Sequence, residues 1–84
     1  MIEIRFFKDV DRICNILIQN GNSNLSKDLG NAAYRNIMPS EVLGETEITL
    51  KKIQYLADKN KELNEAVENL LKSIDNSFQD IGDR

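Results

Sequence analysis

The chain has 84 residues, of which 40% are hydrophobic and 30% charged, and its formal net charge is -3. A chain of this length forms one domain and has too small an interior for a deep enclosed cleft. The acidic balance argues against sequence-independent binding to DNA or RNA, which needs basic groups to neutralise phosphates. We therefore expect residues 1–84 to form a single globular domain.

The residue types that carry most enzyme chemistry are scarce in this sequence. Histidine is absent, which removes the usual general acid-base group and the commonest nitrogen ligand for metals. Cys14 is the only cysteine, so neither an intrachain disulfide nor a cysteine-based zinc site can form. No glycine-rich phosphate loop occurs. We predict that the protein is not an enzyme and uses no metal, cofactor or small-molecule substrate.

The expected location is the cytoplasm. No run of 18 apolar residues occurs, and Glu3 and Asp9 interrupt the apolar residues at the N-terminus. Such a segment is unlike a signal peptide or a membrane-spanning helix. A single cysteine also suits a reducing compartment. We therefore expect no association with a membrane.

The first element is predicted to be a helix that stops at a glycine. Ile2, Ile4 and Phe6 alternate with charged residues as in a strand, but no second strand pattern is present to pair with them. From Phe6 onward the apolar residues follow a helical spacing: Phe6, Val10, Ile13 and Leu17. Asn20-Gly21 should end this helix, because glycine readily adopts the left-handed conformation that follows many helices.

A second, weaker helix is expected next. Ser23 or Asn24 could cap its first backbone amides. Gly30 lies inside it, at a cost of about 1 kcal/mol relative to alanine. Its apolar positions are Leu25, Leu29, Ala32 and Ala33. Pro39 disfavours helical geometry at Met38, so this helix should stop near residue 37.

A third helix is expected after Pro39. Ser40 could cap it, and Glu41 would lie at its positively polarised N-terminal end. Gly44 is expected to loosen its first turn. The apolar face then continues through Thr46, Leu50, Ile53 and Ala57.

The last element has the most regular apolar pattern, a heptad seam of Leu63, Val67, Leu70, Ile74 and Ile81, widened by Leu71 and Phe78. The preceding residues 57–61 contain neither glycine nor proline, and the seam extends back through Asn60. Two all-α architectures are therefore consistent with the sequence. The chain either bends near residues 58–60 into a hairpin, giving a small bundle of three to four helices, or continues as one helix.

The continuous helix would have about 36 residues and a length of about 54 Å. It would extend beyond the first helix and leave its apolar seam exposed, so it would require a homodimer. A buried Asn60 would suit this arrangement, because asparagine sets the register of many coiled coils. Compactness favours the hairpin.

Two groups of residues are candidates for binding a partner protein. Tyr34 and Arg35 are one group, because both residue types are favoured anchors in interfaces and loops held by rigid helices often carry binding sites. The alternative is that Tyr34 and Tyr55 close the core with their hydroxyls in water. The other group consists of carboxylates, Glu41, Glu45 and Glu47 on the third helix and Glu62, Glu65 and Glu68 on the last. Carboxylates in these positions are also common on ordinary solvated helix faces.

The segment from Ala32 to Gly44, followed by Leu50 and Ile53, resembles a pattern in small helical bacterial proteins encoded beside secreted polymorphic toxins. In that pattern a small or hydroxyl residue precedes Glu-Ile/Val-Leu, here within Ser40 to Gly44. Those proteins are suspected immunity proteins of the contact-dependent inhibition type. The resemblance extends loosely over residues 13–75 and departs from the pattern at Pro39, where glycine or threonine would be expected.

This resemblance implies a protein that binds a cognate toxin domain, usually a nuclease, and blocks its active or substrate-binding surface. The carboxylates named above would then meet the basic surface that a nuclease uses for its substrate. Tyr34 and Arg35 would adjoin them. A partner protein, one molecule to one, is the expected ligand.

Two other functions remain open from the sequence. The continuous helix would make the chain a self-associating coiled-coil adaptor. A helix-turn-helix-like pair of the first two helices would make it a small DNA-binding regulator. A recognition helix whose only cations are Lys27 and Arg35 carries little charge for phosphates, however.

Overall fold

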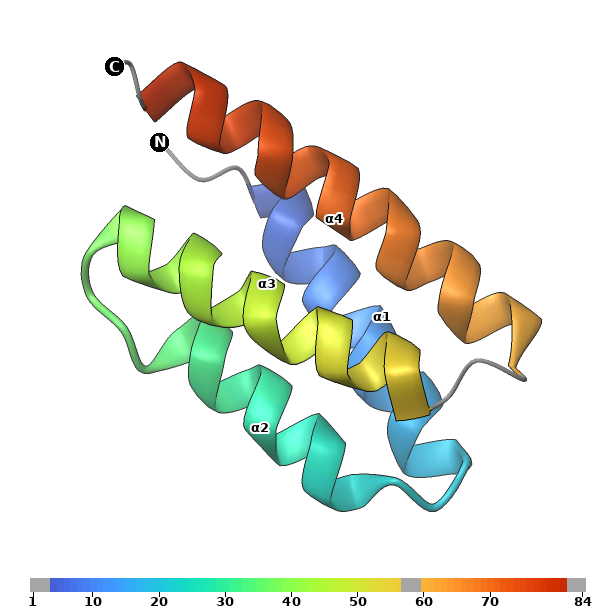
Figure 1. The fold of residues 1–84 in the computed structure, drawn as a ribbon. Coiled ribbons are helices and arrows are strands. Elements are labelled where there is room, and N and C mark those ends of the chain that lie inside the picture. Colours follow the sequence, from blue (N-terminus) through green and yellow to red (C-terminus); the bar gives the residue numbers. More distant parts are fainter. Residues whose placement is uncertain (1–3, 57–59, 82–84) are drawn as a thin grey trace.

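The computed structural model describes residues 4–56 and 60–81, and in these ranges it consists of four α-helices and no strand (Figure 1). The helices are α1 (Ile4–Gln19), α2 (Ser23–Tyr34), α3 (Pro39–Leu56) and α4 (Lys61–Ile81). Each helix packs against two others, in the cyclic order α1, α2, α3, α4 and back to α1. The predicted all-α bundle is confirmed. Ile4 and Phe6 of the strand-like alternation lie in α1 and are helical, whereas Ile2 lies outside the described residues.

The last two helices form an antiparallel hairpin and not a continuous rod. Figure 1 shows α4 running back along α3 and packing beside α1. The predicted heptad seam of α4 is buried inside the bundle at Leu63, Val67, Leu70 and Ile74. The continuous helix is therefore not the fold of this chain. The bend expected near residues 58–60 lies mostly outside the described residues, as do Ala57 and the side chains of Phe78 and Ile81.

Asn60 caps the start of α4, which corrects its interpretation as a buried seam residue. Its side-chain Oδ1 accepts a hydrogen bond from the backbone N–H of Leu63 at 3.0 Å. That amide lies in the first turn, where a helix offers no backbone partner of its own. The sequence thus starts a new helix at Asn60 even though no glycine or proline interrupts it.

We expect Asn60→Ala to lower the free energy of unfolding by about 0.5–2 kcal/mol, because the Leu63 amide loses its acceptor. Urea unfolding followed by circular dichroism measures the change. Asn60→Asp keeps an acceptor and should unfold close to the wild type. Stabilisation by Asn60→Leu, which would complete a coiled-coil seam, would contradict the capping role.

α1 ends at Gln19, directly before the Asn20-Gly21 stop that the sequence predicted. Gly21 has a φ of +82°, and the Asn22 N–H donates a hydrogen bond to the Leu17 carbonyl at 2.7 Å. This six-residue closure is the Schellman motif, which uses a left-handed glycine to satisfy the last carbonyls of a helix. Asn22 leads directly into α2, so Ser23 and Asn24 lie inside that helix and neither is its cap. Asn22 occupies the cap position without a side-chain hydrogen bond.

Gly30 lies inside α2, as predicted, and the fold does not require a glycine there. Its φ is not positive, and a Cβ at this position would have no atom within 4 Å. We expect Gly30→Ala to raise the free energy of unfolding by about 0.5–1 kcal/mol, since alanine loses less backbone entropy on folding. Thermal unfolding measures the gain. Gly21→Ala is the opposing control and should destabilise, because its positive φ strains any residue with a Cβ.

α3 begins at Pro39. The prediction that Ser40 caps this helix is therefore wrong. Proline suits the first helical position, because its φ is already helical and its missing N–H is not needed there. The Met38 carbonyl accepts hydrogen bonds from the Glu41 and Val42 amides at 3.0 Å each. Ser40 therefore lies within the first turn. Glu41 lies in that turn too, as predicted.

The apolar faces of all four helices meet in one core. Its fully buried aliphatic members are Val10, Ile13, Leu17, Leu29, Leu43, Leu50, Ile53, Leu63, Val67, Leu70 and Ile74. The predicted spacing identified most of them, but it began the α3 face at Thr46 and so omitted Val42 and Leu43. Thr46 is itself fully buried, and its hydroxyl oxygen has no hydrogen-bond partner.

Candidate protein-binding surfaces

Tyr34, the last residue of α2, contacts two residues of α1. Its hydroxyl donates a hydrogen bond to Asp11 Oδ1 at 2.6 Å, and its ring centroid lies 5.3 Å from that of Phe7. The residue is still 54% exposed. Tyr34 therefore joins α1 to α2 while part of its surface remains accessible to a partner.

The environment of Tyr34 raises the pKa of its phenol to about 12. Desolvation is the largest cause, followed by the hydrogen bond to Asp11 and by the negative charge of that carboxylate. Because the folded-state pKa lies above the value of about 10 for a free tyrosine, the stabilising contribution is complete below about pH 10. It is lost as the pH rises through about 12.

A phenol absorbance titration tests this contact. Tyr55→Phe leaves Tyr34 as the only tyrosine, and its titration midpoint should lie near pH 12. Adding Asp11→Asn should move the midpoint down toward about 10, because the anionic acceptor is lost. An unchanged midpoint after Asp11→Asn would contradict the bond to that carboxylate.

The loop between α2 and α3, residues 35–38, carries two strongly exposed apolar side chains. Ile37 is 92% and Met38 57% exposed. Near the start of the loop, Asn36 Nδ2 donates a hydrogen bond to the Ala32 carbonyl of α2 at 2.9 Å. At its end, Pro39 begins α3. We call residues 35–38 the α2–α3 loop. The sequence did not single out Ile37 and Met38 as exposed apolar residues, because loop positions lie outside any helical periodicity.

Arg35 is the first residue of this loop and is exposed. Its backbone N–H still bonds to the Asn31 carbonyl at 3.0 Å, so its backbone continues the last turn of α2. Its guanidinium has no ion pair with any residue in the described ranges. Arg35 and Tyr34 are therefore neighbours in sequence, but only Arg35 has a side chain that no contact to α1 restrains.

The three predicted glutamates of α3 do not form one cluster. Glu41 and Glu45 are exposed and lie one helical turn apart on the same face, as the sequence predicted. Glu47 is half-buried, and its carboxylate lies 3.9 Å from the ammonium of Lys51. A partner that contacts Glu41 and Glu45 therefore approaches a different side of α3 from Glu47.

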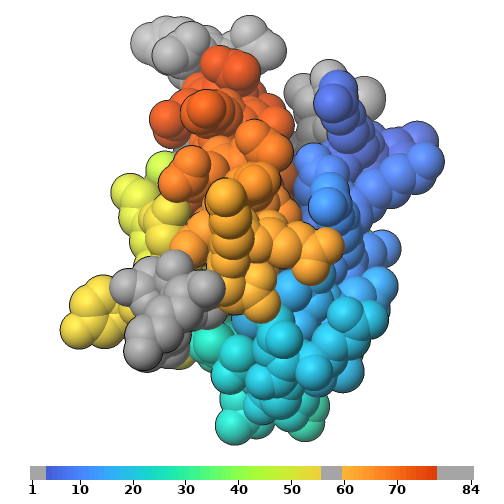
Figure 2. All heavy atoms as spheres, turned by 90° about the vertical axis from the view of Figure 1, so that its right-hand side faces the viewer, coloured from blue at the N-terminus to red at the C-terminus, as the bar shows by residue number. Residues whose placement is uncertain are grey.

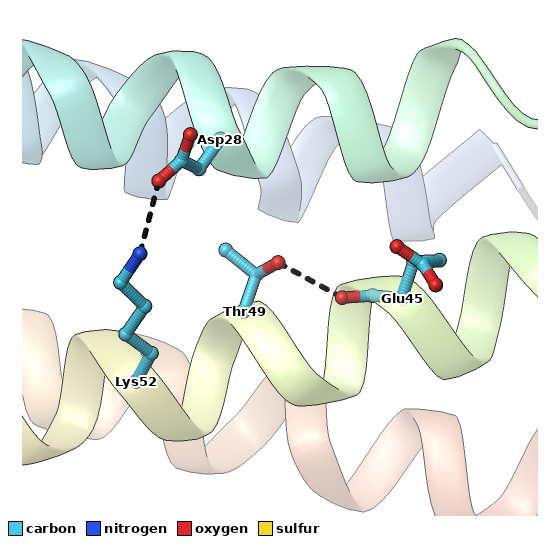
Figure 3. A network of polar contacts seen from close by, with 4 residues as sticks. All are labelled: Asp28, Glu45, Thr49 and Lys52. Carbon is cyan, nitrogen blue, oxygen red and sulfur yellow. Dashed lines mark hydrogen bonds and ion pairs between the residues drawn. The ribbon is translucent and has the colours of Figure 1, made fainter.

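Glu45 lies at the edge of a shallow groove between α2 and α3 (Figure 3). Lys52 reaches across this groove, and its Nζ lies 3.2 Å from Asp28 Oδ2. The Thr49 hydroxyl donates a hydrogen bond to the backbone carbonyl of Glu45 at 2.9 Å. Neither contact uses the Glu45 carboxylate, which has no ion pair within the described residues.

Glu62 and Glu65 line a separate depression between α4 and α1, opposite Arg12. Figure 2 shows these two helices side by side, α1 in blue and α4 in orange, with only shallow hollows between them. Glu68 is exposed on α4 as well. In the cyclic order of helices the α1/α4 side is opposite the α2/α3 side. The structure therefore separates the glutamates of α4 from Glu45.

The described residues contain no group of three Cys, Asp or Glu side chains placed to hold a metal ion. Cys14 is half-buried and packs against the core. Its Sγ lies 3.5 Å from the Ser26 carbonyl oxygen, and burial raises the pKa of the thiol. This environment disfavours the thiolate that a nucleophile would need.

Comparisons of the chain with protein-family models, with curated proteins and with solved structures found no match. Over residues 4–56 and 60–81 the helices are also too short or too polar to cross a membrane. Any functional inference therefore depends on the surfaces described above. Ile37 in the α2–α3 loop is the most exposed large hydrophobic residue of the described ranges, and charged residues flank the loop.

Proposed function

We propose that this protein binds and neutralises a bacterial toxin domain, and that the α2–α3 loop and the first turn of α3 form the contact surface. The observation that carries the proposal is the exposure of Ile37 and Met38 beside the exposed carboxylate of Glu41. Apolar anchors with a polar rim, held between rigid helices, are typical of the energetic centre of a protein interface.

The proposal that the partner is a toxin is supported by where the residues that resemble immunity proteins lie in the fold. The residues that carry it, Ser40 to Gly44, form the first turns of α3 and directly follow the exposed apolar pair. Glu41 and Glu45 offer carboxylates to a basic surface, of the kind that a nuclease uses for its substrate. Arg35 is the first residue of the loop, and the exposed part of Tyr34 directly precedes it.

Neutralisation in this proposal is stoichiometric and needs no chemistry from the inhibitor. The inserted apolar side chains supply affinity, while the carboxylates speed the encounter and fix the orientation of the two proteins. The toxin loses activity because its active or substrate-binding surface is covered. The protein would act in the cytoplasm of the producing cell, where a toxin's substrate must be protected.

A protection assay tests the proposal. Cells that express the toxin domain encoded immediately upstream should survive when they also express this chain, and the two purified proteins should form a one-to-one complex. Ile37→Asp should abolish protection, and Glu41→Lys should weaken it. Ile18→Asp alters an isoleucine of α1 that is 55% exposed and should protect like the wild type.

Circular dichroism on each variant separates lost binding from lost folding. Full protection by a folded Ile37→Asp protein would show that the α2–α3 loop is not the contact surface. Failure of the wild-type chain to bind the toxin domain would rule out the inhibitor function itself.

The geometry gives less support to the two alternative functions. A coiled-coil adaptor built on the continuous helix needs an exposed seam on α4, but that seam packs inside the bundle. A DNA-binding regulator would present α2, where Lys27 is exposed beside Asp28 and Asp28 already pairs with Lys52. Neither the α4 seam nor the exposed side of α2 presents apolar side chains as exposed as Ile37 in the α2–α3 loop.

A further inference from the structure

The outer face of α3 carries exposed apolar residues that no other helix covers. α3 packs against α2 and α4 only. Its solvent-facing stripe follows the spacing i, i+4, i+7, i+11, i+14 and consists of Glu41, Glu45, Ile48, Lys52 and Tyr55, all exposed. Ile48 is 67% and Tyr55 83% exposed. Alternating steps of four and three residues are the spacing by which helices pair with one another. We call these five residues, with Gly44 and Lys51 beside them, the α3 outer face.

The charges on the α3 outer face are divided at Ile48. Both acidic residues, Glu41 and Glu45, precede Ile48, whereas both basic residues, Lys51 and Lys52, follow it. The face is therefore acidic toward the N-terminus of α3 and basic toward its C-terminus. Such a face is complementary to a second copy of itself, provided that the second copy runs in the opposite direction.

We propose that two copies of the chain associate through the α3 outer face, with their α3 helices antiparallel and a two-fold axis beside Ile48. Residues equally distant from Ile48 then lie opposite each other. Ile48 packs on Ile48 of the partner subunit. Glu45 lies level with Lys51 of the partner subunit, whose long side chain can reach across the contact to it. A parallel pairing would place like charges together, which is unfavourable in an interface.

Lys51 is the cation that matches Glu45 in this arrangement. Lys52 is already committed within its own chain, with its ammonium 3.2 Å from Asp28. Lys51 makes only a 3.9 Å contact to Glu47, and its side chain is 65% exposed. The Glu45 carboxylate has no ion pair within the described residues, so both members of the proposed pair are accessible.

Gly44 fits the same geometry. A Cβ at this position would meet no atom within 4 Å, and its φ is not positive, so neither packing nor backbone conformation of the monomer requires glycine. Gly44 lies one turn before Ile48 on the same side of α3. The absence of a side chain there lets a second helix approach the backbone closely.

This dimer goes beyond the proposed inhibitor function. It leaves Ile37 and Met38 accessible but uses Glu45, so toxin binding through Glu45 competes with dimerisation. Ile48 lies ten residues after Met38, or about 15 Å along the helix. The α2–α3 loops of an antiparallel pair therefore lie near its two ends, outside the contact. One helix face buries less than the roughly 800 Å² per partner of a standard interface. We expect a weak dimer whose population depends on protein concentration.

Sedimentation equilibrium of the full chain tests the proposal. The average mass should rise from 9.6 kDa toward twice that value as the protein approaches about 1 mM. Ile48→Asp should keep the protein monomeric, because it would place two carboxylates together at the axis. Ile18→Asp introduces the same change on α1 and should dimerise like the wild type.

Two charge-reversal variants, measured alone and mixed, distinguish a lost interface from a damaged fold. Glu45→Lys and Lys51→Glu should each weaken self-association about tenfold, because every pair across the interface then has like charges. An equimolar mixture of the two variants should form a heterodimer about as tight as the wild-type dimer, since each pair again has opposite charges. A monomeric wild type at about 1 mM, or a mixture no tighter than either variant alone, would overturn the proposal.

Discussion

Replacing Ile13 with alanine should lower the free energy of unfolding by about 2–5 kcal/mol. Ile13 is fully buried in the core face of α1. The substitution removes its apolar contacts and leaves a cavity that the surrounding helices fill only in part. The free energy of unfolding of small domains is about 5–15 kcal/mol. This single change should therefore remove a large share of it. Urea unfolding followed by circular dichroism measures the loss.

Ile18→Ala is the matched control, because it makes the same chemical change on the same helix at a residue that is 55% exposed. Its effect should stay within about 0.5 kcal/mol, as for most surface substitutions. Equal losses at Ile13 and Ile18 would contradict the orientation of α1 in the bundle.

Replacing Thr46 with valine should raise the free energy of unfolding by about 1–3 kcal/mol. Thr46 is fully buried, and its hydroxyl oxygen lacks a hydrogen-bond partner. Valine has the same branched shape, so the change removes the cost of burying an unpaired polar group without creating a cavity. Thermal and urea unfolding should both report the gain.

Thr49→Val provides the comparison on the same helix. The Thr49 hydroxyl bonds to the Glu45 carbonyl at 2.9 Å and is not fully buried, so its removal should give no comparable gain. If Thr46→Val destabilised the protein, the Thr46 hydroxyl would have to make a hydrogen bond in solution.

The sequence predicted the buried helix faces well, because burial of an apolar stripe follows from local spacing. Leu63, Val67 and Leu70 illustrate this, since each lies on the predicted seam and each is fully buried. Helix starts were predicted poorly where several residues could serve as caps. Ser23 and Ser40 both have suitable side chains. The closure at the end of α1 and the fixed φ of proline instead start the helices at Ser23 and Pro39, so neither serine is a cap.

The choice between hairpin and rod could not be made from local pattern. The heptad phase runs without interruption from α3 into α4, so the apolar spacing is the same in both architectures. What distinguishes them is burial of the α4 seam against α1 and α3, which depends on contacts between distant residues. The hydrogen bond from Leu63 to Asn60 is the local feature that agrees with the hairpin.

The candidate site was predicted residue by residue but not as a surface. Glu45 and Glu62 were grouped by charge, whereas the cyclic helix order places them on opposite sides of the bundle. Tyr34 was placed at a helix end, but its bond to Asp11 joins residues far apart in the chain. Ile37 was missed because an exposed apolar loop residue leaves no periodic signal.

The ring-like order in which each helix touches two others has a consequence for how the molecule opens. Removing any one helix would expose the apolar sides of both its neighbours to water. Loss of any one helix should therefore cost nearly as much as loss of the entire fold, so none of the four described helices can be released cheaply while the others stay packed. A partner must accordingly recognise the exterior of the closed bundle, because partly opened forms will be too rare to select.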